Sequence, residues 1–431
     1  MIRLKNNFKC FLKKHSSRPI VLISNSSWYI NHYRNVLINK LISRGEKLIV
    51  IASKDKASEL LSDKLIFIPW SINRRKNYNL FSFLISFIKL FLIIRALKPK
   101  IVHSHTMGPN LLLSIITFLY GIPLLISFAG GKLFKSKGIK KIIHTKIFQI
   151  IAILSCLERN RRFNFSKNKD RTKFIFQNKE DLNDFKNRFN FISRKNINLI
   201  VGSGVPSRYF KKTQSRNNWI KEKSYSSLNT ITFAYSARLI KSKGILTFEK
   251  LSKHFKKDLF KVFGEKDLAS VDSLTDREIK KIKRRNSNIK FHGYVKDPLL
   301  FFNSKYPILL VPSVYKEGMP RGILEAMALC IPVISSKIAP RGMIGDNFIY
   351  LANSDSIEDY LSCIHNVLND YKNNKLRNKL LNAKLYVEKN FSEKIIANQT
   401  LELYDQFLSN KKFRSYLLDR DQKLYSDWIS R

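Results

Sequence analysis

The chain has few of the residues that mark specialised architectures. It contains four cysteines, Cys10, Cys156, Cys330 and Cys363, and no two of them form a CxxC pair. This spacing supports neither a zinc ribbon nor a disulfide scaffold, and the mostly apolar neighbours fit small core residues in a reducing compartment. With only 15 Gly and 12 Pro in 431 residues, the composition also excludes a collagen-like or low-complexity chain.

Acidic residues are scarce as well. The 32 Asp and Glu residues face 79 Lys and Arg residues, which gives a formal net charge of +47. Such a chain attracts polyanions, including nucleic acid, anionic lipid and phosphorylated substrates. The excess charge is spread along a chain rich in Lys, Asn and Ile, a composition that an AT-rich genome also produces. The charge alone therefore selects no partner.

Long apolar runs are also missing. The longest, residues 81–97, contains Lys89 and Arg95 and falls short of the ~20 apolar residues that a spanning helix needs. The basic residues 1–14 precede only five apolar residues, 19–23, too few for the core of a signal peptide. We therefore expect a cytoplasmic protein. Residues 81–97 then form either a buried helix or a helix lying on a membrane surface.

Short apolar runs alternate with longer amphipathic stretches in both halves of the chain. The first half predicts helices at residues 29–44, 81–97, 110–120 and 141–157, between strands at 20–23, 47–52, 101–103, 124–128 and 173–177. The second half predicts strands at residues 230–234, 259–263, 290–291, 308–311, 332–334 and 348–350. This α/β alternation favours parallel sheets with helices on both faces.

The alternation lapses at residues 202–230, where Gly202, Gly204, Pro206 and a polar stretch indicate a linker. We therefore predict two Rossmann-like, doubly wound domains. The expected divisions are a first domain at 1–205, a linker at 206–229, a second domain at 230–391 and C-terminal helices at 392–431 that cross back to the first domain. Such sheets bind ligands beyond the carboxyl ends of their strands, so a deep cleft between the domains is the expected active site.

One segment, residues 308–334, carries most of the chemical information. It predicts a strand, a loop at 312–321, a helix from 323 and a second strand, with Glu317 in the loop and Glu325 near the helix start. Free backbone N–H groups there can bind anions, and a carboxylate can accept hydrogen bonds from a ribose diol. The unit could hold a nucleotide sugar. The alternative is an ordinary helix start whose acids suit the helix dipole.

The same segment, PSVYKEGMPRGILEAMALCIPVI, resembles the Glu-x7-Glu motif of retaining family 4 glycosyltransferases of the GT-B fold. Its two motif residues are Glu317 and Glu325. Residues 233–244 resemble the family's "GRL…KG" element, residues 262–264 its next strand and glycine, and residues 291–295 its "lGyv" strand. Residues 28–45 and 101–106 resemble the members that build bacterial surface polysaccharides, and the resemblance covers most of the chain.

The resemblance implies roles for individual residues. Arg238 and Lys243 would contact the donor diphosphate, which gathers charge in the transition state. Glu317 would lie beside the donor sugar, Glu325 would bind the ribose, and retention by front-face attack needs no side-chain nucleophile. The other residues expected around the donor are Gly264, Tyr294, Val295, Gly318, Met319, Pro320 and Arg321.

The sequence departs from the family in three places. The loop at residues 24–27 lacks the glycines that many members carry, and residues 127–131 lack a histidine that contacts the donor sugar. His103 and His105, on the strand end at 101–106, are candidates for that role, and the alternative is that they are structural histidines. The expected catalytic set is Glu317, Arg238, Lys243 and His105. Cys330 replaces a frequent glycine, and a side chain this small is expected to fit.

Metal and nucleic-acid signatures are weak. The pair Asp419 and Asp421 has the spacing of a metal-binding Asp-x-Asp motif, but it lies among basic residues near the end of the chain and predicts a surface helix. No His, Cys or Glu cluster has metal-ligand spacing, so we expect no essential metal and no cofactor besides the donor. No zinc finger, RRM signature or helix-turn-helix is evident, and we expect no specific nucleic-acid partner.

The sequence therefore predicts a retaining hexosyltransferase with a nucleotide-sugar donor, UDP being the family's commonest carrier and GDP remaining open. The acceptor would be a glycan or an undecaprenyl-linked glycan of capsule, O-antigen or lipopolysaccharide synthesis. Basic segments at 81–100 and 137–146 would meet anionic headgroups at the inner face of the cell membrane. The alternatives are a GT-B-fold sugar-nucleotide epimerase or phosphorylase, and a non-catalytic basic protein that binds polyanions.

Overall fold

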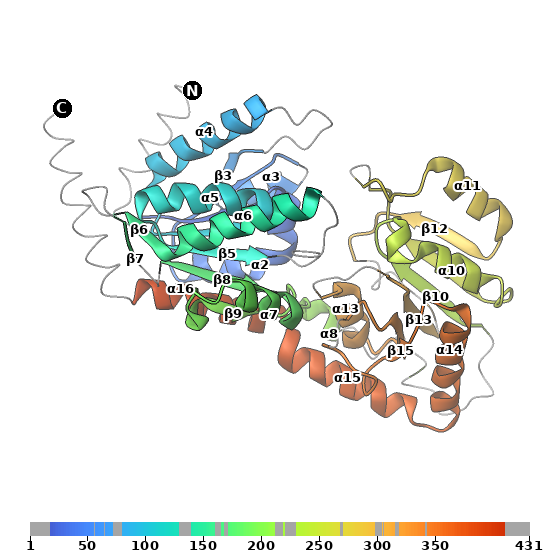
Figure 1. Ribbon diagram of the computed structural model, residues 1–431. Coiled ribbons are helices and arrows are strands. Elements are labelled where there is room, and N and C mark those ends of the chain that lie inside the picture. Colours follow the sequence, from blue (N-terminus) through green and yellow to red (C-terminus); the bar gives the residue numbers. More distant parts are fainter. Residues whose placement is uncertain are drawn as a thin grey trace, which may run out of the picture.

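The structure is a computed structural model. It describes residues 18–409 except 56, 64, 72–79, 129–138, 160–164, 168–170, 212–218, 220–229, 268–269, 298–303, 305, 315–318 and 341–342. Two parallel sheets, each flanked by helices, form an N-terminal and a C-terminal domain that lie side by side (Figure 1). The predicted fold of two Rossmann-like α/β domains is confirmed.

The N-terminal sheet has seven parallel strands in the order β3-β2-β1-β4-β5-β8-β9. The strands are β1 (Ile20–Ile23), β2 (Leu48–Ala52), β3 (Ile66–Pro69), β4 (Ile101–His105), β5 (Leu124–Phe128), β8 (Thr172–Phe176) and β9 (Ile197–Leu199). The helices are α2 (Ser27–Ser43), α3 (Ala57–Ser62), α4 (Leu80–Leu97), α5 (Met107–Tyr120), α6 (Ile139–Cys156) and α7 (Lys179–Arg188), and β6 (Leu157–Arg159) pairs antiparallel with β7 (Phe165–Lys167).

Alternate strand residues supply the two faces of this sheet. Val21 and Ile23 of β1 pack into the core beneath α4, α5, α6 and α7, whereas Ile20 and Leu22 pack into the core beneath α2. Because both faces are buried, the strands read as continuous apolar runs, which is typical of parallel sheets. Strand β1 pairs with both β2 and β4, so the strand order reverses beside it and ligand sites are expected at the carboxyl ends of β1 and β4.

The C-terminal sheet has six parallel strands in the order β12-β11-β10-β13-β14-β15. The strands are β10 (Thr232–Ser236), β11 (Leu259–Phe263), β12 (Ile289–Gly293), β13 (Pro307–Val311), β14 (Val333–Ser336) and β15 (Tyr350–Ala352). One face packs against α10 (Ile245–Ser252), α11 (Asp276–Arg285) and α14 (Ile357–Lys372). The other packs against α8 (Ser207–Lys211), α13 (Arg321–Ala328) and α15 (Leu376–Phe391).

The last described helix returns to the first domain. α16 (Glu393–Leu408) packs along α2 and buries Ile396, Leu401 and Tyr404 in the N-terminal core (Figure 1). Val205 and Ser392 form an isolated β-bridge at the point where the chain crosses between the domains. Gly204 lies at this crossing with φ +85°, and an added Cβ would stand 2.5 Å from the Glu393 Cα, so only glycine fits there.

Several local predictions were wrong in detail. β3, β9 and the β6–β7 hairpin were not expected. The segment expected to be a polar linker contains α8, and Trp219 is buried in the C-terminal core, where its indole N–H donates to the Pro307 carbonyl at 2.8 Å. A single buried aromatic in a polar stretch leaves no periodic pattern, so the sequence does not reveal its packing.

Candidate active site

The donor residues expected from the sequence follow the carboxyl ends of the C-terminal strands. Arg238 follows β10, Gly264 follows β11 and Tyr294 follows β12, while α13 begins at Arg321. Glu317 and Gly318 lie outside the described residues. The structure therefore places all the described members of the expected donor set at one edge of one sheet, the edge where such folds bind ligands.

Two glycines bring the loops of this edge together. Gly264 has φ +150° and its Cβ position lies 1.9 Å from the Ala237 carbonyl oxygen, so the loops after β10 and β11 touch through bare backbone. Gly244 has φ +79° and its Cβ position lies 1.8 Å from the Pro312 carbonyl oxygen. This second contact holds the 3-10 turn Lys241–Lys243 against the loop that leads toward residue 317. No side chain fits at either position.

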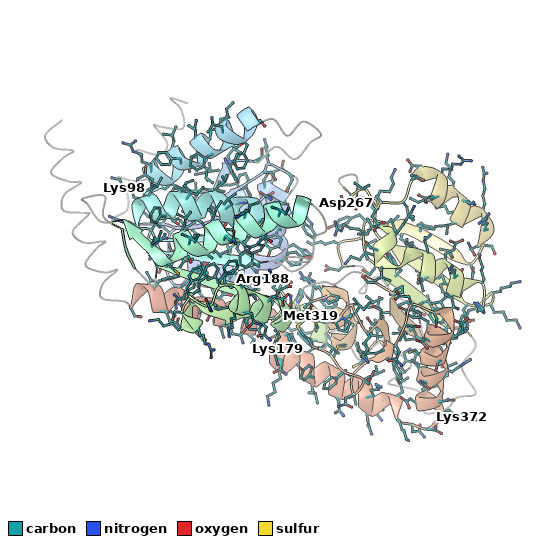
Figure 2. The ribbon with its side chains drawn as sticks, in the orientation of Figure 1. Lys98, Lys179, Arg188, Asp267, Met319 and Lys372 are labelled. Carbon is teal, nitrogen blue, oxygen red and sulfur yellow. The ribbon has the colours of Figure 1, made fainter. Side chains whose placement is uncertain are left out.

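Arg238 and Lys243 keep basic charge at this edge. The Arg238 side chain is largely exposed and forms an ion pair with Asp267, while Lys243 lies at the end of the turn beside Gly244. Figure 2 shows Asp267 on the side of the C-terminal domain that faces the N-terminal domain. An exposed ion pair is weak, so Arg238 can exchange Asp267 for a stronger anion.

Glu325 occupies a very different environment. It is 7% exposed, and the Arg321 side chain, one helical turn earlier, donates from Nε to Glu325 Oε1 at 2.7 Å. Burial raises the pKa of Glu325, while the charge and the hydrogen bond of Arg321 oppose that rise. Met319 and Pro320, also expected near the donor, are buried immediately before this helix, and Figure 2 places Met319 where the two domains meet.

The expected donor edge also touches the N-terminal domain through the first turns of α2. Arg321 Nη1 donates to the His32 carbonyl oxygen at 3.4 Å, and its guanidinium lies 5.1 Å from the centre of the Tyr33 ring. Trp28 Nε1 donates to Tyr294 Oη at 3.2 Å. The stacked rings of Trp28 and His32 therefore form part of the surface between the domains.

His105, the histidine expected in the catalytic set, ends β4 in the N-terminal domain. It is fully buried, its ring lies 4.0 Å from that of His103, and neither ring nitrogen has a hydrogen-bond partner among the described residues. Burial, then the neighbouring charges of His103 and Arg34, hold the pKa of His105 well below its usual range. His105 is consequently a neutral imidazole at physiological pH.

His103 is held firmly by two neighbours. Its Nδ1 lies 2.7 Å from Tyr404 Oη and its Nε2 lies 2.8 Å from Ser127 Oγ. Tyr404 belongs to α16, so the helix that crosses back completes the polar network under the N-terminal sheet edge. The sequence did not indicate this tyrosine as part of the site, because its spacing on an amphipathic helix is that of a core residue.

The loop after β1, which lacks the expected glycines, is bound by a carboxylate from the segment after β2. Asp55 accepts hydrogen bonds from the Ser26 and Ser27 hydroxyls and from the backbone N–H groups of Trp28 and Ala57. A negative side chain therefore already occupies the N-terminus of α2, where it suits the helix dipole. This end of α2 differs in that respect from an open phosphate-binding turn.

A pocket lies where the two domains and the crossing helix meet. Its walls come from α2, α13, α16 and the crossing segment, and its lining includes Arg34, Asn35, Ser203, Arg321 and Glu393. Apart from Arg321, these residues were not expected in the site. Residues 28–45, which include Arg34 and Asn35, resemble the polysaccharide-building members, but that resemblance assigned no site role to either residue.

The structure does not describe every feature singled out from the sequence. Cys10, the segment 129–131 and the pair Asp419 and Asp421 lie outside the described residues. Within the described part of the chain, no group of three or more His, Cys, Asp or Glu side chains is arranged to hold a metal ion. The same part contains no helix whose length and apolar character would suffice to span a membrane. Cys330 is buried with φ +55°, the backbone region that favours the glycine it replaces.

Family models and a curated relative of this chain are glycosyltransferases. The family model described as "Glycosyl transferase 4-like" matches residues 19–155, and "Glycosyl transferases group 1" matches residues 230–370. The capsular polysaccharide biosynthesis glycosyltransferase CapM of Staphylococcus aureus is 26% identical over 359 residues, which cover 79% of this chain and 86% of CapM.

Solved glycosyltransferases share the fold. A glycosyltransferase from Rickettsia africae is 17% identical with a TM-score of 0.69, over 92% of this chain and 100% of that one. HepE of Anabaena, in complex with UDP-glucose, is 13% identical with a TM-score of 0.67, over 90% of this chain and 100% of that one. With a glycosyltransferase model matching each of its two Rossmann-like domains, the chain belongs to the family 4-like glycosyltransferases of the GT-B fold.

Proposed function

We propose that this enzyme transfers a sugar, with retention, from a UDP-sugar to a glycan or lipid-linked glycan acceptor in bacterial surface polysaccharide synthesis. The observation that carries the proposal is the set of donor groups at the carboxyl edge of the C-terminal sheet: Arg238 and Lys243 on one side and Glu325 on the other. CapM supports the polysaccharide role, since it is named for capsular polysaccharide biosynthesis. HepE supports the donor, since it is solved with UDP and with UDP-glucose.

The donor would bind across the edges of β10, β11 and α13. Arg238 would leave Asp267 for the diphosphate, whose charge rises as the sugar departs. Lys243 would add a second cation, and Glu325 would accept hydrogen bonds from the ribose hydroxyls. Gly264 supports this arrangement because its bare backbone keeps the two loops close enough to share one ligand.

The chemistry would need no side-chain nucleophile. The acceptor hydroxyl would attack the anomeric carbon from the face that the diphosphate leaves, and the departing phosphate would take the proton of that hydroxyl. Glu317 would lie beside the donor sugar. His105, a neutral imidazole at the opposing sheet edge, would contribute to the sugar side of the site, and no metal would be required.

The acceptor side would include a membrane surface. Leu84, Ile88 and Leu92 are exposed at four-residue spacing on α4, which places them on one stripe, and α4 also carries Lys89 and Arg95. An apolar stripe with flanking cations suits an anionic bilayer. Co-sedimentation with anionic but not neutral liposomes at physiological salt is expected. Ile88→Asp should weaken this co-sedimentation, and undiminished binding of that variant would exclude the stripe.

The donor assignment is tested by calorimetry at about 0.15 M salt, where the Debye length is ~8 Å. UDP should bind saturably and more tightly than GDP. Glu325→Gln should weaken UDP binding about 10-fold to 100-fold, the scale of hydrogen bonds to a charged group. Arg44→Gln is the matched control, because Arg44 forms an exposed ion pair with Asp405 at the opposite end of α2 from the donor edge. Equal, salt-sensitive binding of every phosphate compound would instead indicate a basic polyanion-binding protein.

A further inference from the structure

The carboxylate expected to bind the ribose is already occupied in this structure. Glu325 and Arg321 lie on α13 at positions i and i−4, with Nε and Oε1 2.7 Å apart. Both side chains are mostly buried, at 10% and 14% exposure. A buried ion pair of this kind differs from the exposed pair of Arg238, because loss of one partner leaves an uncompensated charge away from water.

The other side of the Arg321 guanidinium faces the N-terminal domain. Its Nη1 donates to the His32 carbonyl oxygen, and its Cζ lies over the Tyr33 ring, 5.1 Å from the ring centre. Burial, then the charge of Arg321, lower the pKa of His32 to about 4. His32 is therefore neutral at physiological pH and does not repel the guanidinium, so one side chain binds the donor-side carboxylate and α2 together.

The charges around Glu325 leave Arg321 as its principal counter-ion. From the segment after β12, Asp297 raises the pKa of Glu325, while Arg208 of α8 lowers it less than Arg321 does. Arg208 is itself paired with Asp297 at 2.6 Å, and Tyr209 of α8 also donates to Asp297, at 3.2 Å. Among the neighbouring charges, Arg321 therefore opposes the burial-driven rise in the pKa of Glu325 most strongly.

We propose that Arg321 is a positioning residue for donor recognition: it keeps Glu325 ionised and oriented toward the ribose while α2 of the N-terminal domain holds the guanidinium in place. Recognition of the ribose is thereby coupled to the packing of the two domains. This inference rests on the proposed role of Glu325 with a nucleoside diphosphate donor. It assigns the Arg321 side chain a task distinct from the phosphate and sugar contacts expected of its loop.

The test compares binding of UDP and 2′-deoxy-UDP by calorimetry between pH 6 and pH 8. The wild type should prefer UDP, with a preference that varies little over this range. Arg321→Gln should reduce the preference about tenfold, the scale of a charged hydrogen bond. It should also make the remaining preference weaker at pH 6 than at pH 8, because a buried carboxyl without its counter-ion takes up a proton more readily. Arg44→Gln should behave as the wild type.

Two further variants separate the parts of the proposal. Arg321→Lys keeps the charge but loses the planar fork, so it should restore the flat pH profile with a reduced preference. Tyr33→Leu keeps apolar bulk on α2 but removes the ring beneath the guanidinium, and it should reduce the preference in the same direction as Arg321→Gln, by less. An unchanged preference in Tyr33→Leu would overturn the coupling to the N-terminal domain.

The remaining outcomes distinguish the proposed role of Arg321 from the ribose-binding role of Glu325 on which it rests. A wild type that binds UDP and 2′-deoxy-UDP equally overturns the ribose role of Glu325 and this inference together. A wild type that prefers UDP, with an Arg321→Gln variant that keeps both the preference and its flat pH profile, overturns the inference alone. Circular dichroism and thermal unfolding of each variant show whether a loss of binding reflects a loss of fold.

Discussion

The two sheet edges that face the domain junction use opposite chemistry. At the N-terminal edge the buried histidines are neutral, and His103 is linked to Tyr404 and Ser127. The C-terminal edge is charged, with ion pairs at Arg238 and at Arg321. A nucleotide donor brings negative charge, so the ion pairs of the C-terminal edge fit the donor side in the proposed function.

The edges also differ in how their charge is buried. On the C-terminal side, Asp267 has Arg238 beside it and Glu325 has Arg321 beside it. On the N-terminal side, burial lowers the pKa of His103 and His105 and so keeps both histidines uncharged. Pairing and neutralisation are two ways in which a protein tolerates buried titratable groups. Glu325 at the C-terminal edge is paired, whereas the two histidines at the N-terminal edge are neutral.

The largest expected effect concerns the glycine that builds the charged edge. Gly244→Ala would force a Cβ to within 1.8 Å of the Pro312 carbonyl oxygen, so the turn that carries Lys243 must move. Gly45 has a similar φ of +73° but open space around its Cβ position. Urea unfolding should show a loss of about 1 kcal/mol for Gly45→Ala, from backbone strain alone, and a loss of at least about 3 kcal/mol for Gly244→Ala.

UDP binding should distinguish the same two glycine variants. Gly244→Ala should also abolish measurable UDP binding. Gly45→Ala should leave it intact, since Gly45 follows the C-terminal end of α2 and the contacts with the donor edge come from the first turns of that helix. Similar stability losses in the two variants would mean that the loop relaxes around the new side chain. The close approach of these loops would then have little structural importance.

The next largest effect is the pH dependence of stability that the buried histidines cause. Burial lowers the pKa of His103 and His105 well below 6.5 and that of His32 to about 4. The unfolded chain therefore takes up more protons below about pH 6.5, and stability should fall as the pH drops from there toward 4. Each histidine contributes at most about 1.4 kcal/mol per pH unit.

A variant tests whether His105 contributes to this dependence of the unfolding free energy on pH. His105→Gln removes one of the three groups, so the slope of unfolding free energy against pH between about 6.5 and 5 should become shallower. The measurement is urea unfolding at several pH values, and only the slope is compared, because the substitution changes the absolute stability as well. A slope equal to that of the wild type would show that His105 becomes charged in the folded protein.

The smallest expected effect concerns the exposed pair. Asp267→Asn removes the partner of Arg238 and should change stability by less than about 1 kcal/mol, as for other exposed ion pairs. Because Arg238 would no longer have to break its ion pair with Asp267 to bind the diphosphate, UDP affinity should rise a few-fold. A fall in UDP affinity would instead mean that Asp267 orients Arg238 for the diphosphate, and the charged edge would then be preassembled.

Much of the architecture was predictable because it depends on local pattern. Apolar runs such as Ile20–Ile23 and Leu124–Phe128 are buried on both faces, which is why they stand out and why the predicted doubly wound domains were confirmed. β3 and β9 were missed because they are short and only partly buried. Runs of three or four residues are too short for a periodic pattern to distinguish a strand from other buried segments.

The candidate site was predictable to the extent that it follows motifs. Glu325, Arg238 and Lys243 stand out through their spacing to strands and glycines, and the glycosyltransferase class that they implied is confirmed by the family models. Their catalytic and binding roles remain predictions. Asp267, Tyr404 and His32 were not identified, because an acid in a loop, a tyrosine on an amphipathic helix and a histidine in an aromatic cluster each have ordinary structural explanations.

The sequence by itself determined the α/β class, the two domains and the motif of the donor edge, since hydrophobic periodicity and glycine position act over a few neighbouring residues. Only the tertiary structure decided which charges meet. Arg321 reaches the backbone of His32, and Tyr404 reaches His103, across most of the chain. Such pairs form because folding brings distant segments into a low-dielectric junction where each polar group needs a partner, and no local pattern records that partner.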